Sequence, residues 1–485
     1  MKLIYNVKDR PKFSQTLVFA LQQLLAIMAA TIAVPAQVAK VDNVETGLTA
    51  AAALLGAGVG TLVYQLFTRF RSPVFLGSSF AFIGPMIAAF SGAYANVMLG
   101  YTGLLLGAVF AGLVYVAIAI AVKFAGTNWI SKIMPPVVIG PIVATIGLSL
   151  SGYAVSLVQA GDVTDEAGNM LASPNVALIC ALVTLLAVVI SSIYGKKMAK
   201  LIPFIIGILA GYLVAVIFTI IGNAAGIDSL KVINFAPFQA LVADGVKFST
   251  FLSLPDLIFV GAFKGIKDLT GAYVAKIAVA YIPVAFVVFA EHLADHKNLS
   301  YIIEKDLTKD PGLDKTLLGD GVGSIAGTFF GGCPNTTYGE SIACVAITKN
   351  ASVVSITLAS FLSIAVAFIS PFVAFLQSIP SCVMGGVCLT LYGFIAVSGL
   401  KMLQPVDLGD NRNLFTASVI LIIGTGGLLI NFGQIQLRTV ACALILGVIV
   451  NLIANARKDK TDEGSGEVAE APAEEKAEET TEDKQ

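Results

Sequence analysis

The stretch Gly331–Thr348, GGCPNTTYGESIACVAIT, is a polar opening, broken by glycine and proline, that leads into a short apolar run. Long apolar segments dominate the rest of the chain, so this stretch reads as an interrupted membrane helix with an acid, Glu340, at its tip. Non-helical backbone persists at membrane depth only where it is buried in protein or lines a cavity. We therefore expect the stretch to form one wall of a binding site.

The composition indicates an all-α polytopic membrane protein. Of the 485 residues, 56% are hydrophobic and 13% are charged, whereas soluble domains carry about 25% charged residues. A span needs roughly 20 mostly apolar residues, and the chain has about 14 candidates. They cover residues 14–38, 46–68, 80–95, 99–123, 134–152, 175–194 and 200–222 in the first half, and 275–295, 316–331, 339–348, 352–372, 377–397, 414–431 and 436–455 in the second.

Charge and cysteine usage exclude several classes of partner. The formal net charge of −1 favours no nucleic acid. No cofactor or metal is expected, because the two histidines form one cluster and the cysteines lie in or beside apolar spans without a ligand-like pair. The N-terminus has no small-residue cleavage site, so no cleaved signal peptide is expected. The cysteines expected to be free are Cys180, Cys333, Cys344, Cys382, Cys388 and Cys442.

Basic residues alternate between successive loops in a way that places both termini in the cytoplasm. An odd number of spans in each half makes the second half inverted relative to the first, as in inverted-repeat transporters. The basic loop 227–276 is the exception, and a re-entrant or surface helix within 254–263 is an alternative there. The expected divisions are an N-terminus over 1–13, a first repeat over 14–222, a long loop over 223–274, a second repeat over 275–455, and a disordered acidic tail over 456–485.

The third span of each half is expected to be broken. Ser72–Pro85, SPVFLGSSFAFIGP, resembles the opening stretch in having proline, a short polar and aromatic run, and then a short apolar helix. Paired short segments interrupted by glycine or proline are the best sequence pointer to a transporter binding site. Two half-helix N-termini would then face one another near the bilayer midplane.

Ionisable residues inside spans are rare, and each is a candidate functional group. Glu291 lies in VVFAEHLADHKN, and Asp295 follows it by four residues, about 40 degrees round the same helix face. Two carboxylates on one face favour a shared proton. The simplest interpretation of His292 and His296 is that they mark the cytoplasmic membrane boundary.

Backbone amides at a half-helix N-terminus donate to carbonyl oxygens, and a facing carboxylate accepts N–H donors. Together these groups suit a flat neutral solute with lactam edges. The rings of Phe80, Tyr338 and Tyr392 are candidates to stack on its faces.

The stretches LGSSFAFIGP, FAEHLADHKNLS, KDPGLDKTLLGDG, PNTTYGESIACVAIT and MGGVCLTLYGFIAVSG, in this order and spacing, resemble the nucleobase/ascorbate transporter family, and most closely its bacterial uracil permeases. The resemblance covers roughly residues 10–455, with PNTTYGE as its most specific motif. It implies about 14 segments in two inverted repeats, with a core domain that rocks against a gate domain, usually in a homodimer. It also implies proton-coupled uptake of a nucleobase.

The resemblance also implies roles for individual residues. Glu291 and Glu340 would hold the N–H edge of the base, and the backbone N–H groups of Phe80 and Gly339 would meet a carbonyl oxygen. The residues implied to line the pocket are Phe80, Tyr338, Tyr392 and Ala30.

The chain departs from the family pattern at three places. The family usually has Gln-His where this chain has Gln22-Gln23, and Asn where it has Ser341, two positions that tend to interact. We expect the Ser341 hydroxyl to accept a hydrogen bond from Gln23. The third departure is Asp295, where uracil permeases often have His, which makes Glu291 and Asp295 the expected proton-coupling pair.

The sequence thus predicts a multi-pass protein of the inner, cytoplasmic membrane that imports uracil or a related nucleobase with protons. The nearest alternative is a xanthine or other purine permease of the same family. A sulfate-permease-type anion transporter fits less well, because such proteins typically present a cation to the substrate. A membrane enzyme would need a nucleophile, metal cluster or cofactor motif among the spans.

Overall fold

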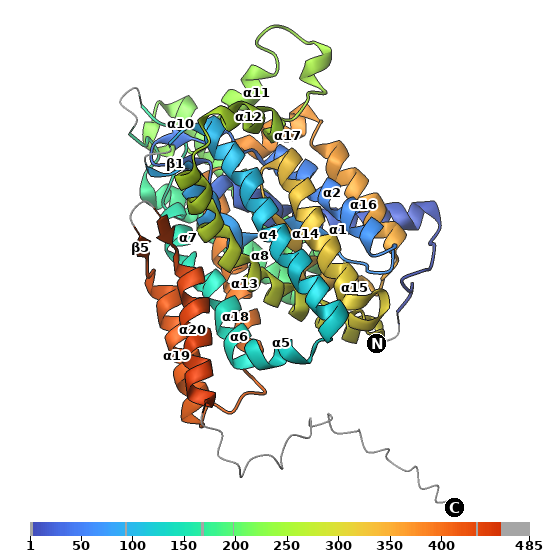
Figure 1. Cartoon of the computed structure of the whole chain (residues 1–485). Helices are drawn as coiled ribbons and strands as arrows, with labels where there is room; N and C mark the ends of the chain where they lie inside the picture. The colour runs from blue at the N-terminus through green and yellow to red at the C-terminus, as the bar shows by residue number, and fades with distance from the viewer. Residues whose placement is uncertain (1–2, 93–94, 166–168, 197, 433–434, 457–485) are drawn as a thin grey trace, which may run out of the picture.

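The computed structural model describes residues 3–92, 95–165, 169–196, 198–432 and 435–456, and within them helices dominate (Figure 1). Eight of the described helices are long and apolar enough to cross a membrane, and four shorter apolar helices accompany them. The chain is therefore a multi-pass membrane protein. The predicted acidic tail lies outside the described residues except for Ala456.

Each predicted span overlaps a helix, but several boundaries differ, and the predicted span 352–372 is divided between two helices. The first half contains α1 (Phe13–Gln37), β1 (Lys40–Val41), β2 (Val44–Glu45), α2 (Ala50–Phe67), β3 (Leu76–Ser78), α3 (Ile83–Phe90), α4 (Val97–Ala125), α5 (Asn128–Ile133), α6 (Pro136–Ser149), α7 (Ser151–Leu157), α8 (Pro174–Tyr194), α9 (Met198–Leu201) and α10 (Pro203–Ala225). Two short helices, α11 (Ala236–Ala240) and α12 (Ile258–Gly265), come next. The second half contains α13 (Gly271–Ile303), α14 (Leu313–Gly331), β4 (Asn335–Thr337), α15 (Gly339–Thr348), α16 (Val353–Val366), α17 (Ser370–Ser378), α18 (Ser381–Lys401), α19 (Asn411–Gly426), β5 (Ile430–Phe432), β6 (Ile435–Leu437) and α20 (Thr439–Asn455).

Two groups of helices pack mainly among themselves. In one group, α14 packs against α2 and α4, while α1 packs against α2 and α16, and α13 packs against α4. In the other, α18 packs against α6 and α8, while α10 packs against α8, and α19 packs against α6 and α20. Each group draws helices from both halves of the sequence. The end of α20 and helix α11 lie at opposite ends of the molecule (Figure 1).

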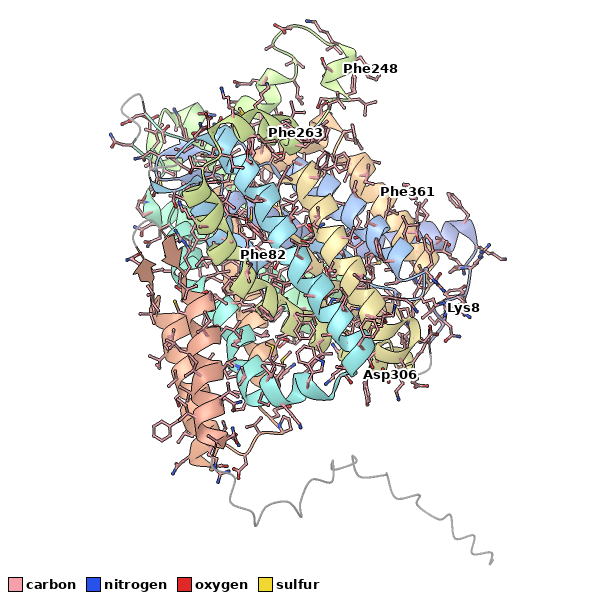
Figure 2. All side chains as sticks on the ribbon, viewed as in Figure 1. Lys8, Phe82, Phe248, Phe263, Asp306 and Phe361 are labelled. Atoms are coloured by element: carbon pink, nitrogen blue, oxygen red, sulfur yellow. The ribbon has the colours of Figure 1, made fainter. Side chains whose placement is uncertain are left out.

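The periphery of the bundle is apolar. Phe361 projects from the side of the bundle and is 54% exposed, whereas Phe82 lies inside it and is 1% exposed (Figure 2). Leu113 on α4, Ile190 on α8 and Leu213 on α10 are also exposed. Large exposed apolar surfaces are rare in soluble monomers, so these faces suit contact with lipid.

Glycines let α2 and α14 approach closely. A Cβ atom added to Gly56 would lie 2.4 Å from the carbonyl oxygen of Gly327, and one added to Gly331 would lie 2.4 Å from that of Ala52. Small residues at helix interfaces allow such backbone contact in membranes. We call the contact formed by Gly56, Gly60, Gly323, Gly327 and Gly331 the glycine seam.

The helix that carries Glu291 is longer than predicted. The apolar run indicates a span over 275–295, but α13 continues to Ile303. His292 and His296, which the sequence suggested as boundary markers, are both fully buried within the protein. The two histidine rings form hydrogen bonds with Tyr64 on α2 and Asp320 on α14. The polar residues after Glu291 therefore continue the buried helix α13.

The long loop is partly helical. Within it, α12 overlaps the apolar stretch 254–263, as the alternative interpretation of the sequence suggested. This helix packs against α4 and α14, and Thr102 Oγ1 donates a hydrogen bond to the carbonyl oxygen of Ala262 at 2.7 Å.

A charged cluster ties the end of α2 to the connection between α13 and α14. Asp310 lies 2.9 Å from both Lys305 Nζ and Arg71 Nη1. These two cations lower the pKa of Asp310 to about 2. The contribution of Asp310 to stability is thus present above its ordinary pKa and is lost as the pH falls toward 2. It is a small contribution, because the pair is about half exposed to solvent.

The glycine seam generates a prediction about stability. Gly56→Ala would push a methyl group into the backbone of α14, so we expect the free energy of unfolding to fall by about 1–3 kcal/mol. Thermal unfolding of the purified protein in detergent measures this loss. Gly393→Ala is the matched control, since no atom lies within 4 Å of its added Cβ. Equal melting temperatures for the two variants would contradict the seam's role.

Candidate functional site

The two broken segments meet in a short antiparallel ribbon. Strand β3 pairs with β4, with Leu76 opposite Thr337 and Ser78 opposite Asn335. Beyond the ribbon, the backbone N–H of Ser79 donates to the carbonyl oxygen of Pro334 at 2.9 Å. The ribbon satisfies extended backbone inside the bundle and places the N-terminus of α15 directly after it.

Three predicted acids line one cavity. A cavity of about 350 Å³ is lined by Glu291 and Asp295 from α13, Gly339 and Glu340 from the start of α15, and Phe394 from α18. It therefore lies between the two helix groups. None of the ion pairs among the described residues includes Glu291, Asp295 or Glu340.

A second cavity, of about 710 Å³, shares Asp295, Asn298, Phe394 and Ser398 with the first. It also reaches Lys401, at the end of α18. The two cavities are therefore neighbours, and Asp295 lines both of them. Sequence reasoning missed Phe394, Asn298 and Ser398, because nothing in the sequence distinguishes them from other helix residues.

The predicted aromatic residues pack beside the cavity. The rings of Phe80 and Tyr392 make an edge-to-face contact with centroids 5.6 Å apart, which joins the two helix groups. The Tyr338 hydroxyl donates to the carbonyl oxygen of Ser78 at 2.8 Å. Ala30 is buried in α1, one turn after Ala26, which lines the cavity. None of these four predicted residues lines the 350 Å³ cavity, and Phe80 lines a separate cavity of about 160 Å³.

Asp295 is held by the ribbon. Its Oδ2 accepts a hydrogen bond from Thr337 Oγ1 at 2.7 Å. The described residues show no hydrogen bond between Asp295 and Glu291. The proton-sharing pair suggested by the sequence therefore stays a prediction.

The predicted contact between Gln23 and Ser341 is confirmed. Gln23 Nε2 donates to Ser341 Oγ, and the backbone N–H of Phe75 donates to the same oxygen at 3.1 Å. Ser341 is fully buried. One hydroxyl thus connects α1, the segment before β3 and α15.

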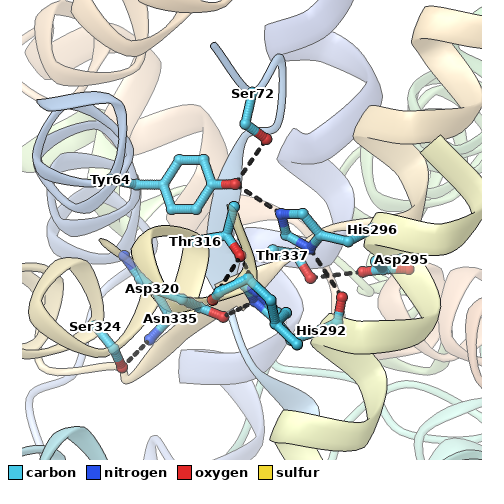
Figure 3. Close-up of polar contacts among 11 residues, drawn as sticks. Tyr64, Ser72, His292, Asp295, His296, Thr316, Asp320, Ser324, Asn335 and Thr337 are labelled. Carbon is cyan, nitrogen blue, oxygen red and sulfur yellow. Dashed lines mark hydrogen bonds and ion pairs between the residues drawn. The ribbon is translucent and has the colours of Figure 1, made fainter. Parts of the chain in front are cut away.

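His292 and His296 belong to a polar network that the sequence did not reveal (Figure 3). His292 Nδ1 lies 2.7 Å from Asp320 Oδ2 on α14, and His296 Nε2 lies 2.8 Å from the Tyr64 hydroxyl on α2. Asp320 and both histidines are fully buried. The signal that was missed is the position of Asp320 inside the predicted span 316–331, where a charged residue is rare.

All six cysteines are free and buried. Within the described residues, no group of three or more His, Cys, Asp and Glu side chains is arranged to hold a metal ion.

A model of the permease family matches residues 14–432. The chain belongs to the permease family. This membership confirms the family resemblance read from the sequence and identifies the protein as a transporter instead of an enzyme.

Relatives of this permease match over nearly their whole length. A uracil permease of Bacillus caldolyticus is 37% identical over 94% of this chain and 96% of its own. The uracil permease of Bacillus subtilis is 37% identical over 95% and 97%, and that of Escherichia coli K12 is 34% identical over 92% and 93%.

Solved transporters share the fold of this permease. The transmembrane domain of the cyanobacterial bicarbonate transporter BicA has a TM-score of 0.58 at 15% identity and covers 93% of this chain and 99% of its own. The murine Solute Carrier 26 family member A9 anion transporter, in the inward-facing state, has a TM-score of 0.59 at 12% identity and covers 92% and 69%.

The Ser341 contacts give a prediction for the permease. Ser341→Ala leaves the buried Gln23 amide and the Phe75 N–H without their acceptor, so we expect a loss of stability of about 1–3 kcal/mol for each donor left unpaired. Thermal unfolding in detergent measures the loss, with Ser398→Ala, an exposed serine on the cavity wall, as the control. An unchanged melting temperature in Ser341→Ala would show that the hydroxyl is dispensable.

Proposed function

We propose that this permease imports uracil, or a closely related nucleobase, together with protons across the cytoplasmic membrane. The placement of Glu291, Glu340 and the start of α15 on one cavity supports this proposal most strongly. The names of the relatives, three of which are uracil permeases at 34–37% identity, favour uracil as the substrate.

The chemistry of the cavity fits a flat lactam. A carboxylate accepts the N–H groups of uracil, and backbone N–H groups in the first turn of a helix are free to donate to its carbonyl oxygens. In the proposed complex, Glu291 and Glu340 accept from the base and the Gly339 N–H donates to it. The Phe80 N–H donates from the opposite half, and Tyr338, Tyr392 and Ala30 close around the ring.

Protons are the proposed coupling ion. Glu291, Asp295 and Glu340 line the cavity without an ion pair among the described residues, and an unpaired carboxylate buried in a membrane protein is costly. Protonation of Glu291 as substrate binds removes one of these charges. Each charge that crosses the membrane at about 100 mV contributes roughly 2.3 kcal/mol.

The proposed architecture has about 14 segments in two inverted repeats, over 14–222 and 275–455. The two helix groups suggest a core domain with α1–α4 and α13–α16, and a gate domain with α6–α10 and α18–α20. Alternating access then moves one domain against the other across the Phe80–Tyr392 contact. We further propose a homodimer in the inner membrane, with the N-terminal segment 1–13 and the tail 456–485 in the cytoplasm and the loop 223–274 outside.

Uptake into proteoliposomes tests the proposed transport reaction. We expect an acidic exterior to drive accumulation of labelled uracil, because proton entry is coupled to uptake, and a protonophore to abolish it. Unlabelled uracil should compete better than xanthine, whereas the opposite order would favour the purine permease. Accumulation that persists with the protonophore would exclude proton coupling.

Glu340→Gln tests the acid at the tip of α15. The variant loses a charge-assisted acceptor for the base, so we expect uracil affinity to fall by about tenfold or more. Isothermal titration calorimetry of the purified protein measures this change, and Glu45→Gln, an exposed acid on β2, is the matched control. Wild-type affinity in Glu340→Gln would remove Glu340 from the site.

A further inference from the structure

Asp320 is a buried acid that the proposed binding chemistry does not use. We propose that His292 and Asp320 form a net-neutral pair that retains its proton and positions the face of α13 that carries Glu291 and Asp295. This inference rests on the proposed function only for the role of Glu291 and Asp295 in binding substrate and protons. The pair itself is defined by its own hydrogen bonds.

The hydrogen bonds around His292 indicate where its protons lie. Thr316 Oγ1 lies 3.1 Å from the carbonyl oxygen of Leu313, which can only accept, so the threonine hydroxyl donates there. His292 Nε2 lies 3.1 Å from the same Thr316 oxygen and must then donate to it. His292 Nδ1 and Asp320 Oδ2, 2.7 Å apart, share one further proton. The hydrogen bond between Nδ1 and Oδ2 needs this proton, and with it alone the pair is neutral overall.

Loss of the proton shared by His292 and Asp320 would cost free energy. Asp320 and His292 are fully buried, and Asp320 Oδ1 has no hydrogen-bond partner. Removing the shared proton would leave Asp320 as a buried carboxylate next to a neutral imidazole ring. A buried charge without an opposite charge is strongly unfavourable. The pair is therefore a fixed structural element, in contrast to Glu291, which faces the cavity.

Three side chains of α13 form hydrogen bonds with neighbouring elements. His292 fixes the helix to α14, His296 fixes it to Tyr64 on α2, and Asp295 fixes it to Thr337 on β4. His292 and His296 also stack, with ring centroids 4.0 Å apart. These contacts set the rotation of α13 and leave Glu291 directed at the cavity.

Other titratable groups surround the pair. From α13 these are Glu291, Asp295 and His296, and the other helices contribute Tyr64 on α2 and Tyr115 on α4. The Tyr115 ring makes an edge contact with His292, with centroids 6.2 Å apart. Any pH effect assigned to the pair must therefore be separated from these groups by comparing variants that leave all of them intact.

The experiment compares four full-length proteins in detergent: wild type, His292→Gln, Asp320→Asn and His292→Gln/Asp320→Asn. Melting temperature and uracil affinity are each measured from pH 5 to pH 9. In His292→Gln the amide still forms hydrogen bonds but cannot hold the proton, so Asp320 now titrates alone. We expect this variant to lose stability at alkaline pH. Its uracil affinity, divided by that of the wild type at the same pH, should be about tenfold lower at alkaline pH than at acidic pH.

The double variant decides the interpretation. Asp320→Asn removes the group that titrates, so the double variant is expected to recover the pH profile of the wild type and to melt higher than His292→Gln alone. If His292→Gln does not fold, folding of the double variant supports the pair in the same way. Identical pH profiles for His292→Gln and the double variant, or failure of both to fold while Asp320→Asn folds normally, would overturn the proposal.

The two proposals fail in different ways. A wild-type protein that does not bind uracil would contradict the proposed function, whereas the melting temperatures of the four proteins would still test the pair. Asp244→Asn, an exposed aspartate in the loop before α12, is the control for loss of a carboxylate and should match the wild type at every pH.

Discussion

Extended backbone cannot face lipid, and this constraint governs the centre of the molecule. Each broken segment carries a strand of three residues, and each strand satisfies the backbone of the other. Neither segment has this solution alone, so the ribbon joins the two halves of the chain at the point where both α3 and α15 begin. The cavity, the acids and the start of α15 follow from this one pairing.

Close packing around the ribbon accounts for the glycines on the facing sides of α2 and α14. The glycine seam brings α2 against α14, and the side chain of Asn335 donates to the carbonyl oxygen of Gly56 at 3.0 Å. Polar contacts then fix α13 on three sides. Apolar packing alone is weakly directional, whereas satisfied buried hydrogen bonds specify one arrangement.

The sequence predicted the helices well because lipid imposes a simple rule on length and composition. It also predicted the broken segments, the two acids on one cavity and the contact between Gln23 and Ser341. It failed at the end of α13, where His292, His296 and Lys297 resemble a membrane boundary although both histidines are buried. Asp320 and Phe394 were missed, because their importance arises from partners on other helices that composition does not reveal.

The ribbon has one further consequence, which concerns insertions and deletions. Side chains on a strand alternate between faces, so a shift of one residue moves every side chain to the other side. In β4, the shift that a deletion causes would put Tyr338 in the place of Thr337, whose hydroxyl donates to Asp295. A deletion in this segment is therefore not tolerated, while the exposed residues 242–249 between α11 and α12 have room to vary. Among natural variants, gaps should be absent from the ribbon even where substitutions are common.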